Sequence, residues 1–99
     1  MVLLDVERSL ARPGNRTRSE ILAHILDIAR SGALKTHIMY KANLSHKQLH
    51  KYLAFLESNG LLQVVTNHEG KRCFQITEKG VEFLKEYTRL SNYFGERTL

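Results

Sequence analysis

This 99-residue sequence has few of the residues that build disulfide-bonded, metal-bound or membrane-spanning proteins. Its one cysteine, Cys73, excludes an intrachain disulfide and a zinc site built from a cysteine cluster. No apolar run approaches the ~18 residues that a transmembrane helix needs. The first ten residues carry acids within their apolar part and have no cleavage signal after them, unlike a secretory peptide. These absences predict one intracellular, cytoplasmic domain.

Motifs that carry catalysis are also missing. The sequence has no glycine-rich phosphate loop, no G-x-S-x-G motif and no pair of carboxylates in an apolar context. His46 and His50 are four residues apart and could chelate a metal ion on one helix face, but no third ligand is evident. We therefore expect no metal, no cofactor and no enzymatic activity.

Acidic residues are absent from residues 28–56, and this absence localises the net charge. Residues 1–27 carry four bases and four acids, and residues 57–99 carry six of each. The formal net charge of +5 thus comes from one stretch, whose bases are Arg30, Lys35, Lys41, Lys47 and Lys51. A surface with charge of one sign usually faces a polyanion, although a solvated basic face without a partner is the alternative.

Turn and capping residues divide the chain into short helices. The single proline lies in a break at residues 12–15, after an amphipathic arm that carries Leu3, Val6 and Leu10 at helical spacing. A capping box at Thr17 and Glu20 predicts a helix that Gly32 ends, and residues 33–35 could form a small strand.

Two further helices are predicted on either side of a tight turn. Thr36 is expected to cap a short helix over residues 37–42, which ends at Asn43. A second capping box, formed by Ser45 and Gln48, opens a helix that runs to about residue 59. The turn between the two helices holds Leu44, which we expect to be buried, and its length is typical of a helix-turn-helix.

The period of the apolar residues changes from 3.6 to 2 after residue 60. Residues 61–65 and 73–76 alternate as strands around a turn at residues 67–70, which predicts a β-hairpin. Thr77 then caps a last helix that runs to about residue 93. The predicted fold is α+β and mostly α: a winged helix-turn-helix over residues 16–77, a C-terminal helix over 78–99, and an N-terminal helical arm over 1–15.

Three strings of residues in this order resemble the archaeal winged helix-turn-helix family. They are Lys35-Thr36-x-Ile38-Met39-Tyr40-x-Ala42-Asn43-Leu44-Ser45, Tyr52-Leu53-x-x-Leu56-x-x-x-Gly60-Leu61-Leu62 and Ile76-Thr77-Glu78-Lys79-Gly80. The resemblance covers about residues 16–90. The family includes small transcriptional regulators and related DNA-binding proteins that dimerise through a C-terminal coiled coil. The resemblance implies DNA binding, with the helix after Ser45 as the recognition helix.

The predicted recognition helix, residues 46–59, has a face suited to the major groove. Apolar residues gather on one side of it, whereas the opposite side carries Lys47, His50, Lys51 and Ala54. His46 and Gln48 flank this face near the helix N-terminus, and Ser45 just before them is a further candidate for DNA contact. Gln48 could contact adenine, but the capping box is the alternative use of its side chain.

Four further candidates for DNA contact lie outside the recognition helix. Thr36 and His37 open the preceding helix, whose N-terminus could hold a phosphate. Lys71 and Arg72 belong to the wing, residues 66–72, and could contact the adjacent backbone or minor groove. The alternative is that these two charged residues only keep the hairpin soluble. For Arg16 and Arg18, phosphate contact and plain solvation stay equally open, and Cys73 is interpreted as a buried apolar residue rather than a redox sensor.

The last predicted helix carries a second apolar stripe. Phe83, Tyr87, Leu90 and Phe94 lie on one side, with spacings of 4, 3 and 4 that suit a short coiled-coil seam. We therefore expect a homodimer through this helix, with the N-terminal arm adding to the interface. The alternative is that the arm folds back and covers the stripe within one chain.

Together these patterns favour a sequence-specific double-stranded DNA-binding protein of the nucleoid, acting as a transcriptional regulator. An architectural chromatin protein of low specificity is one alternative, and a winged-helix module that binds proteins is another. The bases on the recognition helix argue against the protein-binding module, for which an apolar or acidic face is expected.

Overall fold

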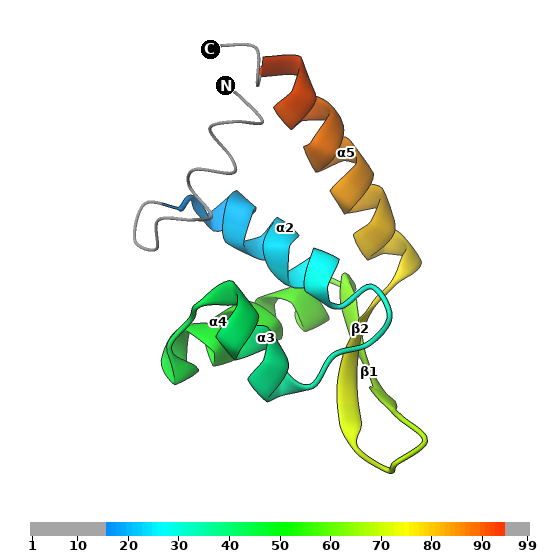
Figure 1. Ribbon diagram of the computed structural model, residues 1–99. Coiled ribbons are helices and arrows are strands. Elements are labelled where there is room, and N and C mark those ends of the chain that lie inside the picture. Colours follow the sequence, from blue (N-terminus) through cyan, green and yellow to red (C-terminus); the bar gives the residue numbers. More distant parts are fainter. Residues whose placement is uncertain (1–15, 95–99) are drawn as a thin grey trace.

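The structure, a computed structural model, describes residues 16–94 and contains four helices and one two-stranded sheet within that range (Figure 1). The elements in chain order are α2 (Arg18–Ile28), α3 (Lys35–Ala42), α4 (His46–Ser58), β1 (Leu62–Thr66), β2 (Arg72–Ile76) and α5 (Glu78–Phe94). Three helices precede a hairpin, which confirms the predicted winged-helix fold. The predicted N-terminal arm, residues 1–15, lies outside the described residues.

Both predicted capping boxes are present. The Glu20 backbone N–H donates to Thr17 Oγ1 at 3.1 Å, and the Thr17 N–H donates to Glu20 Oε1 at 2.8 Å, which starts α2. Ser45 and Gln48 form the same pair of bonds at the start of α4. Each box satisfies backbone donors that a helix N-terminus leaves unpaired, so these helix starts are encoded locally.

Two predicted helix boundaries are wrong because tertiary contacts set them. Helix α2 ends at Ile28 with Ala29 as its cap, three residues before Gly32. The Ala29 carbonyl accepts a bond from the Ile76 N–H at 3.0 Å, so the end of β2 ties down the backbone where α2 stops. Gly32, with φ of 95°, instead closes the turn that follows, its N–H donating to the Ala29 carbonyl.

Helix α3 also begins earlier than expected. Its cap is Leu34, no side chain bonds to the cap, and Thr36 lies inside the first turn rather than capping the helix. The reason is the short bridge between Ala33 and Phe74, whose N–H and C=O groups bond to each other at 2.9 and 2.8 Å. Because this bridge fixes the backbone at the sheet edge, the chain turns into the helix as soon as it leaves Ala33.

The hairpin pairs β1 and β2 antiparallel, from Leu62 opposite Ile76 to Thr66 opposite Arg72. Cys73, Phe74 and Ile76 are buried, so β2 forms one wall of the core, and Cys73 is the buried apolar residue that the sequence predicted. The fully buried centre of the core joins the three N-terminal helices through Ile25, Leu26, Ile38, Leu49 and Leu56. Leu44, in the turn, is 7% exposed, as predicted.

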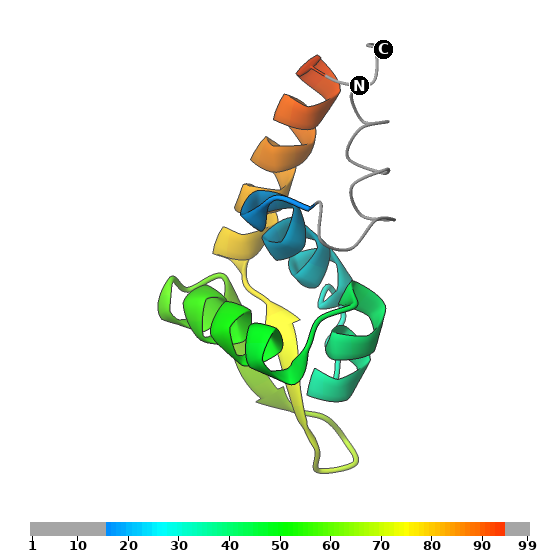
Figure 2. The same cartoon turned by 90° about the vertical axis from the view of Figure 1, so that its left-hand side faces the viewer.

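Helix α5 starts where Thr77 Oγ1 accepts the Gly80 N–H at 3.0 Å, as expected for the predicted cap. A side chain at position 80 would collide with the Leu61 carbonyl and with the Ile76 side chain, so glycine allows α5 to begin directly against the sheet. The helix then runs away from the wing, which projects at the opposite end of the molecule (Figures 1 and 2). None of the described helices is long and apolar enough to cross a membrane.

Candidate nucleic-acid interface

Helix α4 has one face in the core and one face in solvent. Leu49, Leu53 and Leu56 are at most 4% exposed. The predicted DNA-facing residues Lys47, His50, Lys51 and Ala54 are all exposed. The small side chain of Ala54 lets a ligand approach the helix backbone, while the two lysines supply charge. The predicted orientation of this helix is confirmed, and its contact with DNA stays a prediction.

The first turn of α4 uses two predicted contact residues for its own cap. Gln48 Oε1 accepts the Ser45 N–H at 2.9 Å, and Ser45 Oγ accepts the Gln48 N–H at 3.1 Å. Bidentate recognition of adenine needs both the oxygen and the nitrogen of the Gln48 amide. The capping bond uses one of the two lone pairs of the oxygen and fixes the orientation of the amide, so Gln48 can meet a base only in the orientation that the capping box sets.

His46 and His50 lie one turn apart on the flank of the same face. Their ring centroids are 4.4 Å apart and the rings are tilted by 44°. The pKa of His50 is lowered, first by partial loss of hydration and then by the positive fields of His46 and Lys35. No group of three metal-ligating residues occurs among residues 16–94.

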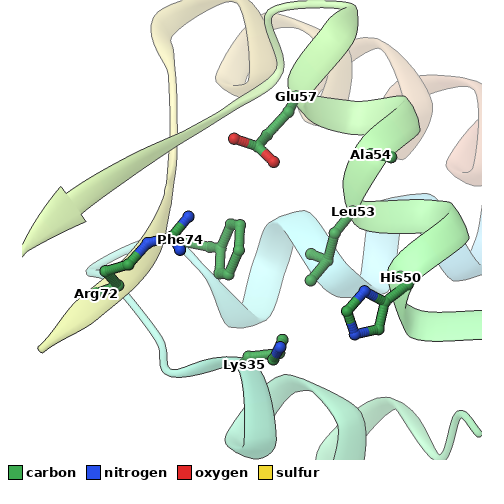
Figure 3. Close-up of a pocket in the computed structure, with 7 residues that line it drawn as sticks. All are labelled: Lys35, His50, Leu53, Ala54, Glu57, Arg72 and Phe74. Atoms are coloured by element: carbon green, nitrogen blue, oxygen red, sulfur yellow. The ribbon is translucent and has the colours of Figure 1, made fainter. Parts of the chain in front are cut away.

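A hollow of about 400 Å³ separates α4 from the wing. It is lined by Lys35 at the start of α3, His50 and Glu57 on α4, and Arg72 on β2 (Figure 3). Three segments far apart in sequence thus meet at one concave surface, to which α3 and β2 contribute the basic side chains of Lys35 and Arg72. Phe74 and Leu53 form the apolar part of its wall.

Glu57 is a lining residue that the sequence interpretation did not select, whereas Lys35 was already among the predicted bases at the start of the preceding helix. Glu57 lies seven residues after His50 and three after Ala54, which places it on the same flank of α4. That helical spacing was the available signal, but the hollow itself depends on the position of β2. Among the described residues, Glu57 is the one acid that lines this hollow.

The start of α3 presents the other predicted contacts. Thr36 and His37 are exposed, and Thr36 lines an open hollow with Met39, Tyr40 and Asn43. Tyr40 is 87% exposed, which is unusual for an aromatic side chain and was not foreseen from the sequence.

The wing is organised by Asn67. Its Oδ1 accepts the Glu69 N–H at 2.8 Å and the Lys71 N–H at 2.9 Å, and Gly70 adopts a φ of 80°. This turn leaves Lys71 and Arg72 exposed at the base of the returning strand. Arg72 faces the hollow beside α4, whereas Lys71 lies in the turn itself.

The predicted dimer stripe on α5 is split between the core and solvent. Phe83 and Tyr87 stack with centroids 6.2 Å apart and pack, half-buried, against the core. The pKa of Tyr87 is raised, chiefly by burial and then by the charge of Glu20. Leu90 is 54% exposed, and the side chain of Phe94 lies outside the described residues. The exposed half of α5 lies far from α4 and the wing (Figure 2).

The winged helix-turn-helix family matches residues 15–94, which is most of the chain. The protein belongs to this family. An uncharacterized protein of Methanocaldococcus jannaschii is 39% identical over 66 residues, which are 66% of this chain. The matched segment spans 63% of that relative's length.

Solved structures share the winged-helix fold. Sso10a-2, a DNA-binding protein from Sulfolobus solfataricus, superposes with a TM-score of 0.66 at 26% identity, over 79% of this chain and 84% of that one. MepR, a transcription regulator of a Staphylococcus aureus efflux pump, gives 0.67 at 14% identity, over 91% and 67% of the two chains. A MarR-family regulator from Rhodococcus gives 0.65 at 20% identity, over 94% and 67%. At these low identities, MepR and the Rhodococcus regulator show only that the fold is shared.

Proposed function

We propose that this winged-helix protein is a sequence-specific double-stranded DNA-binding protein that regulates transcription. The observation that carries the proposal is the exposed face of α4, where Lys47 and Lys51 lie on the same side of the helix as the small Ala54. Basic side chains from α3 and β2 extend this surface around the hollow beside α4. The likeness to a DNA-binding protein at 26% identity supports the same function.

In this proposal α4 enters the major groove and the wing lies on the adjacent backbone or minor groove. An α-helix fits the major groove, and cations on its outer face contact the phosphates that border it. Lys71 and Arg72 would reach the next stretch of backbone. The N-terminal turn of α3, with Thr36 and His37 exposed, would approach a phosphate on the other side of α4.

We also propose that two copies pair through α5. Leu90 is 54% and Tyr93 is 78% exposed on the half of the helix that extends beyond the core. Because this half lies far from the DNA-facing surface, pairing would leave both recognition helices free (Figure 2). A two-fold dimer matches a DNA site with two half-sites. Phe83 and Tyr87 would contribute their exposed edges, and Phe94 would extend the seam.

An architectural, nucleoid-associated protein of low specificity is the second candidate. It is favoured by the capping role of Gln48, because the bond from the Ser45 N–H restricts how the amide can turn toward a base. The lysines on α4 would then bind phosphates without sequence preference. In either case the protein would act with the chromosome in the cytoplasm.

Fluorescence anisotropy with two duplexes separates these functions. One duplex would be selected from a random pool by the protein itself, and the other would be its scrambled sequence, each measured at two salt concentrations. A regulator should bind the selected duplex at least about 10³-fold more tightly. An architectural protein should bind both alike, with a steep salt dependence. Failure to bind either duplex would contradict DNA binding and favour a protein-binding module.

A further inference from the structure

Arg16 bonds to a turn that lies 26 residues further along the chain. Its Nη1 donates to the Ala42 carbonyl at 2.6 Å, and its Nη2 donates to the Asn43 carbonyl at 3.2 Å. Ala42 is the last residue of α3, and Asn43 is its left-handed cap, with φ of 56° and ψ of 55°. The guanidinium therefore sits at the junction between α3 and α4. The structure thus gives this side chain a third use besides the phosphate contact and the solvation that the sequence left open.

The turn satisfies some of its own carbonyls but not these two. The Asn43 N–H donates to the Tyr40 carbonyl at 3.2 Å, and the Leu44 N–H donates to the Met39 carbonyl at 3.0 Å. Among the described residues, no backbone N–H donates to the carbonyls of Ala42 or Asn43. A cation at a helix C-terminus also interacts favourably with the helix dipole. The planar, two-pronged guanidinium is thus matched to this site.

The surroundings of Arg16 fix its side chain in place. Arg16 is half-buried and precedes Thr17, the cap of α2, so it ties the start of one helix to the end of another. His24 on α2 lies close by, since the Arg16 charge lowers the His24 pKa after the larger effect of burial. Arg16 Nε and His24 Nδ1 are both buried and have no hydrogen-bond partner among the described residues. A side chain this enclosed is oriented toward the protein.

The carbonyls of Ala42 and Asn43 belong to the turn that sets the direction of α4 relative to α3. Two residues after Asn43, Ser45 opens the capping box of α4, and Leu44 between them is buried. Asn43 holds a left-handed backbone state that is uncommon outside glycine, although asparagine adopts it more readily than most residues. Loss of the Arg16 bonds would leave this turn free to sample other geometries, each of which re-aims the N-terminal half of α4.

We propose that Arg16 is a positioning residue for the recognition helix: it clamps the turn between α3 and α4 and thereby sets DNA affinity without touching DNA. The second part of this statement rests on the DNA-binding function proposed above. Affinity falls in proportion to the fraction of molecules in the binding-competent conformation. A residue of this kind changes affinity but leaves the number of phosphate contacts unchanged.

Three substitutions and one control test the clamp. Arg16→Ala removes both bonds and the charge, Arg16→Gln keeps a neutral donor, and Arg16→Lys keeps the charge but not the fork. Arg18→Ala is the control, because the Arg18 side chain is exposed, carries the same charge and has no hydrogen bond or ion pair with the described residues. Circular dichroism and the thermal midpoint of each variant establish that it is folded.

The first readout is amide hydrogen exchange in the protein without DNA. The amides of Asn43 and Leu44 should exchange faster in Arg16→Ala and Arg16→Gln than in the wild type. Arg16→Lys should keep part of their protection against exchange, and Arg18→Ala should keep all of it. The Leu61 amide, which donates to Leu56 at the far end of α4, reports on global opening and should not change. Equal exchange in Arg16→Ala and Arg18→Ala would overturn the clamp, whether or not the protein binds DNA.

The second readout is the salt dependence of duplex binding. Arg16→Ala should weaken binding by about tenfold, the effect of a competent population reduced to roughly a tenth. The slope of log affinity against log salt should stay that of the wild type, whereas a lost phosphate contact would lower it by about 0.9. A lowered slope would overturn the positioning role and make Arg16 a phosphate ligand. A wild-type protein that binds no duplex would refute the proposed function, with the exchange data still deciding the clamp.

Discussion

Replacing Lys47 and Lys51 together is the most direct test of the recognition helix. Both side chains are exposed on α4 and lie one turn apart, about 6 Å along the helix axis. If α4 enters the major groove, both ammonium groups contact backbone phosphates. The double variant Lys47→Ala/Lys51→Ala removes these contacts and leaves the buried face of α4 untouched.

The magnitude follows from counterion release. Each lost phosphate contact lowers the slope of log affinity against log salt by about 0.9, so two contacts lower it by about 1.8. If affinity at 1 M salt is unchanged, binding at 0.1 M salt then weakens by roughly 60-fold. With only one lysine in contact, the expected loss is about 8-fold with a slope change of about 0.9.

Folding stability should change little. Surface substitutions away from caps and ion pairs usually alter the free energy of unfolding by less than about 0.5 kcal/mol. Alanine has the highest helix propensity, and the change removes two like charges four residues apart. Chemical denaturation therefore separates a binding defect from a folding defect.

The assay is fluorescence anisotropy at several salt concentrations, with Arg18→Ala/Lys85→Ala as the control. Both control residues are exposed on α2 and α5, and the control lowers the net charge by the same amount. Wild-type affinity and slope in the Lys47/Lys51 variant would refute the assignment of α4. An equal loss in the control would attribute binding to net charge rather than to this face.

Three further outcomes are expected. Lys71→Ala/Arg72→Ala should weaken binding to selected and scrambled duplexes by similar factors, because backbone contacts carry no sequence information. A loss of affinity confined to one base position would instead make Arg72 a groove-reading residue. Unchanged affinity would mean that the hairpin only supports the fold. Leu90→Arg should give a folded monomer in sedimentation with much weaker DNA binding. A wild-type protein that is already monomeric at tens of micromolar, a concentration on the order of that used in sedimentation, would contradict the dimer. His24, whose pKa is lowered mainly by burial and then by Arg16, is more easily protonated in the unfolded chain, so the free energy of unfolding should fall as the pH drops below 6.5. Denaturation of His24→Gln across this range should show a shallower fall, and an identical pH dependence would contradict the assignment.

Local sequence determined the starts of α2, α4 and α5 and the two faces of α4. The capping boxes at Thr17 and Ser45, and the cap at Thr77, involve residues three apart, so no distant contact is needed to form them. The buried and exposed sides of α4 follow from the helical period of its apolar residues. The change to alternation after residue 60 likewise sufficed to place the hairpin.

Only the tertiary structure decided where α2 ends and α3 begins. Both boundaries are set by hydrogen bonds to β2: the Ile76 N–H donates to the Ala29 carbonyl, and Phe74 pairs with Ala33. These partners are more than 40 residues away along the chain, beyond the reach of capping rules that compare neighbouring residues. Gly32 and Thr36, which the sequence predicted as helix boundaries, are therefore not the boundaries, because hydrogen bonds to the sheet set them.

The same reason explains what the sequence showed of the candidate interface and what it did not. The exposed lysines of α4 could be predicted because their orientation depends on one helix. The hollow shared by Lys35, Glu57 and Arg72 requires three elements to meet, and the Arg16 clamp requires α2 to pack on α3. Sequence thus determined the local elements and their polarity, whereas packing decided which distant side chains share a surface and which carbonyls a single arginine holds.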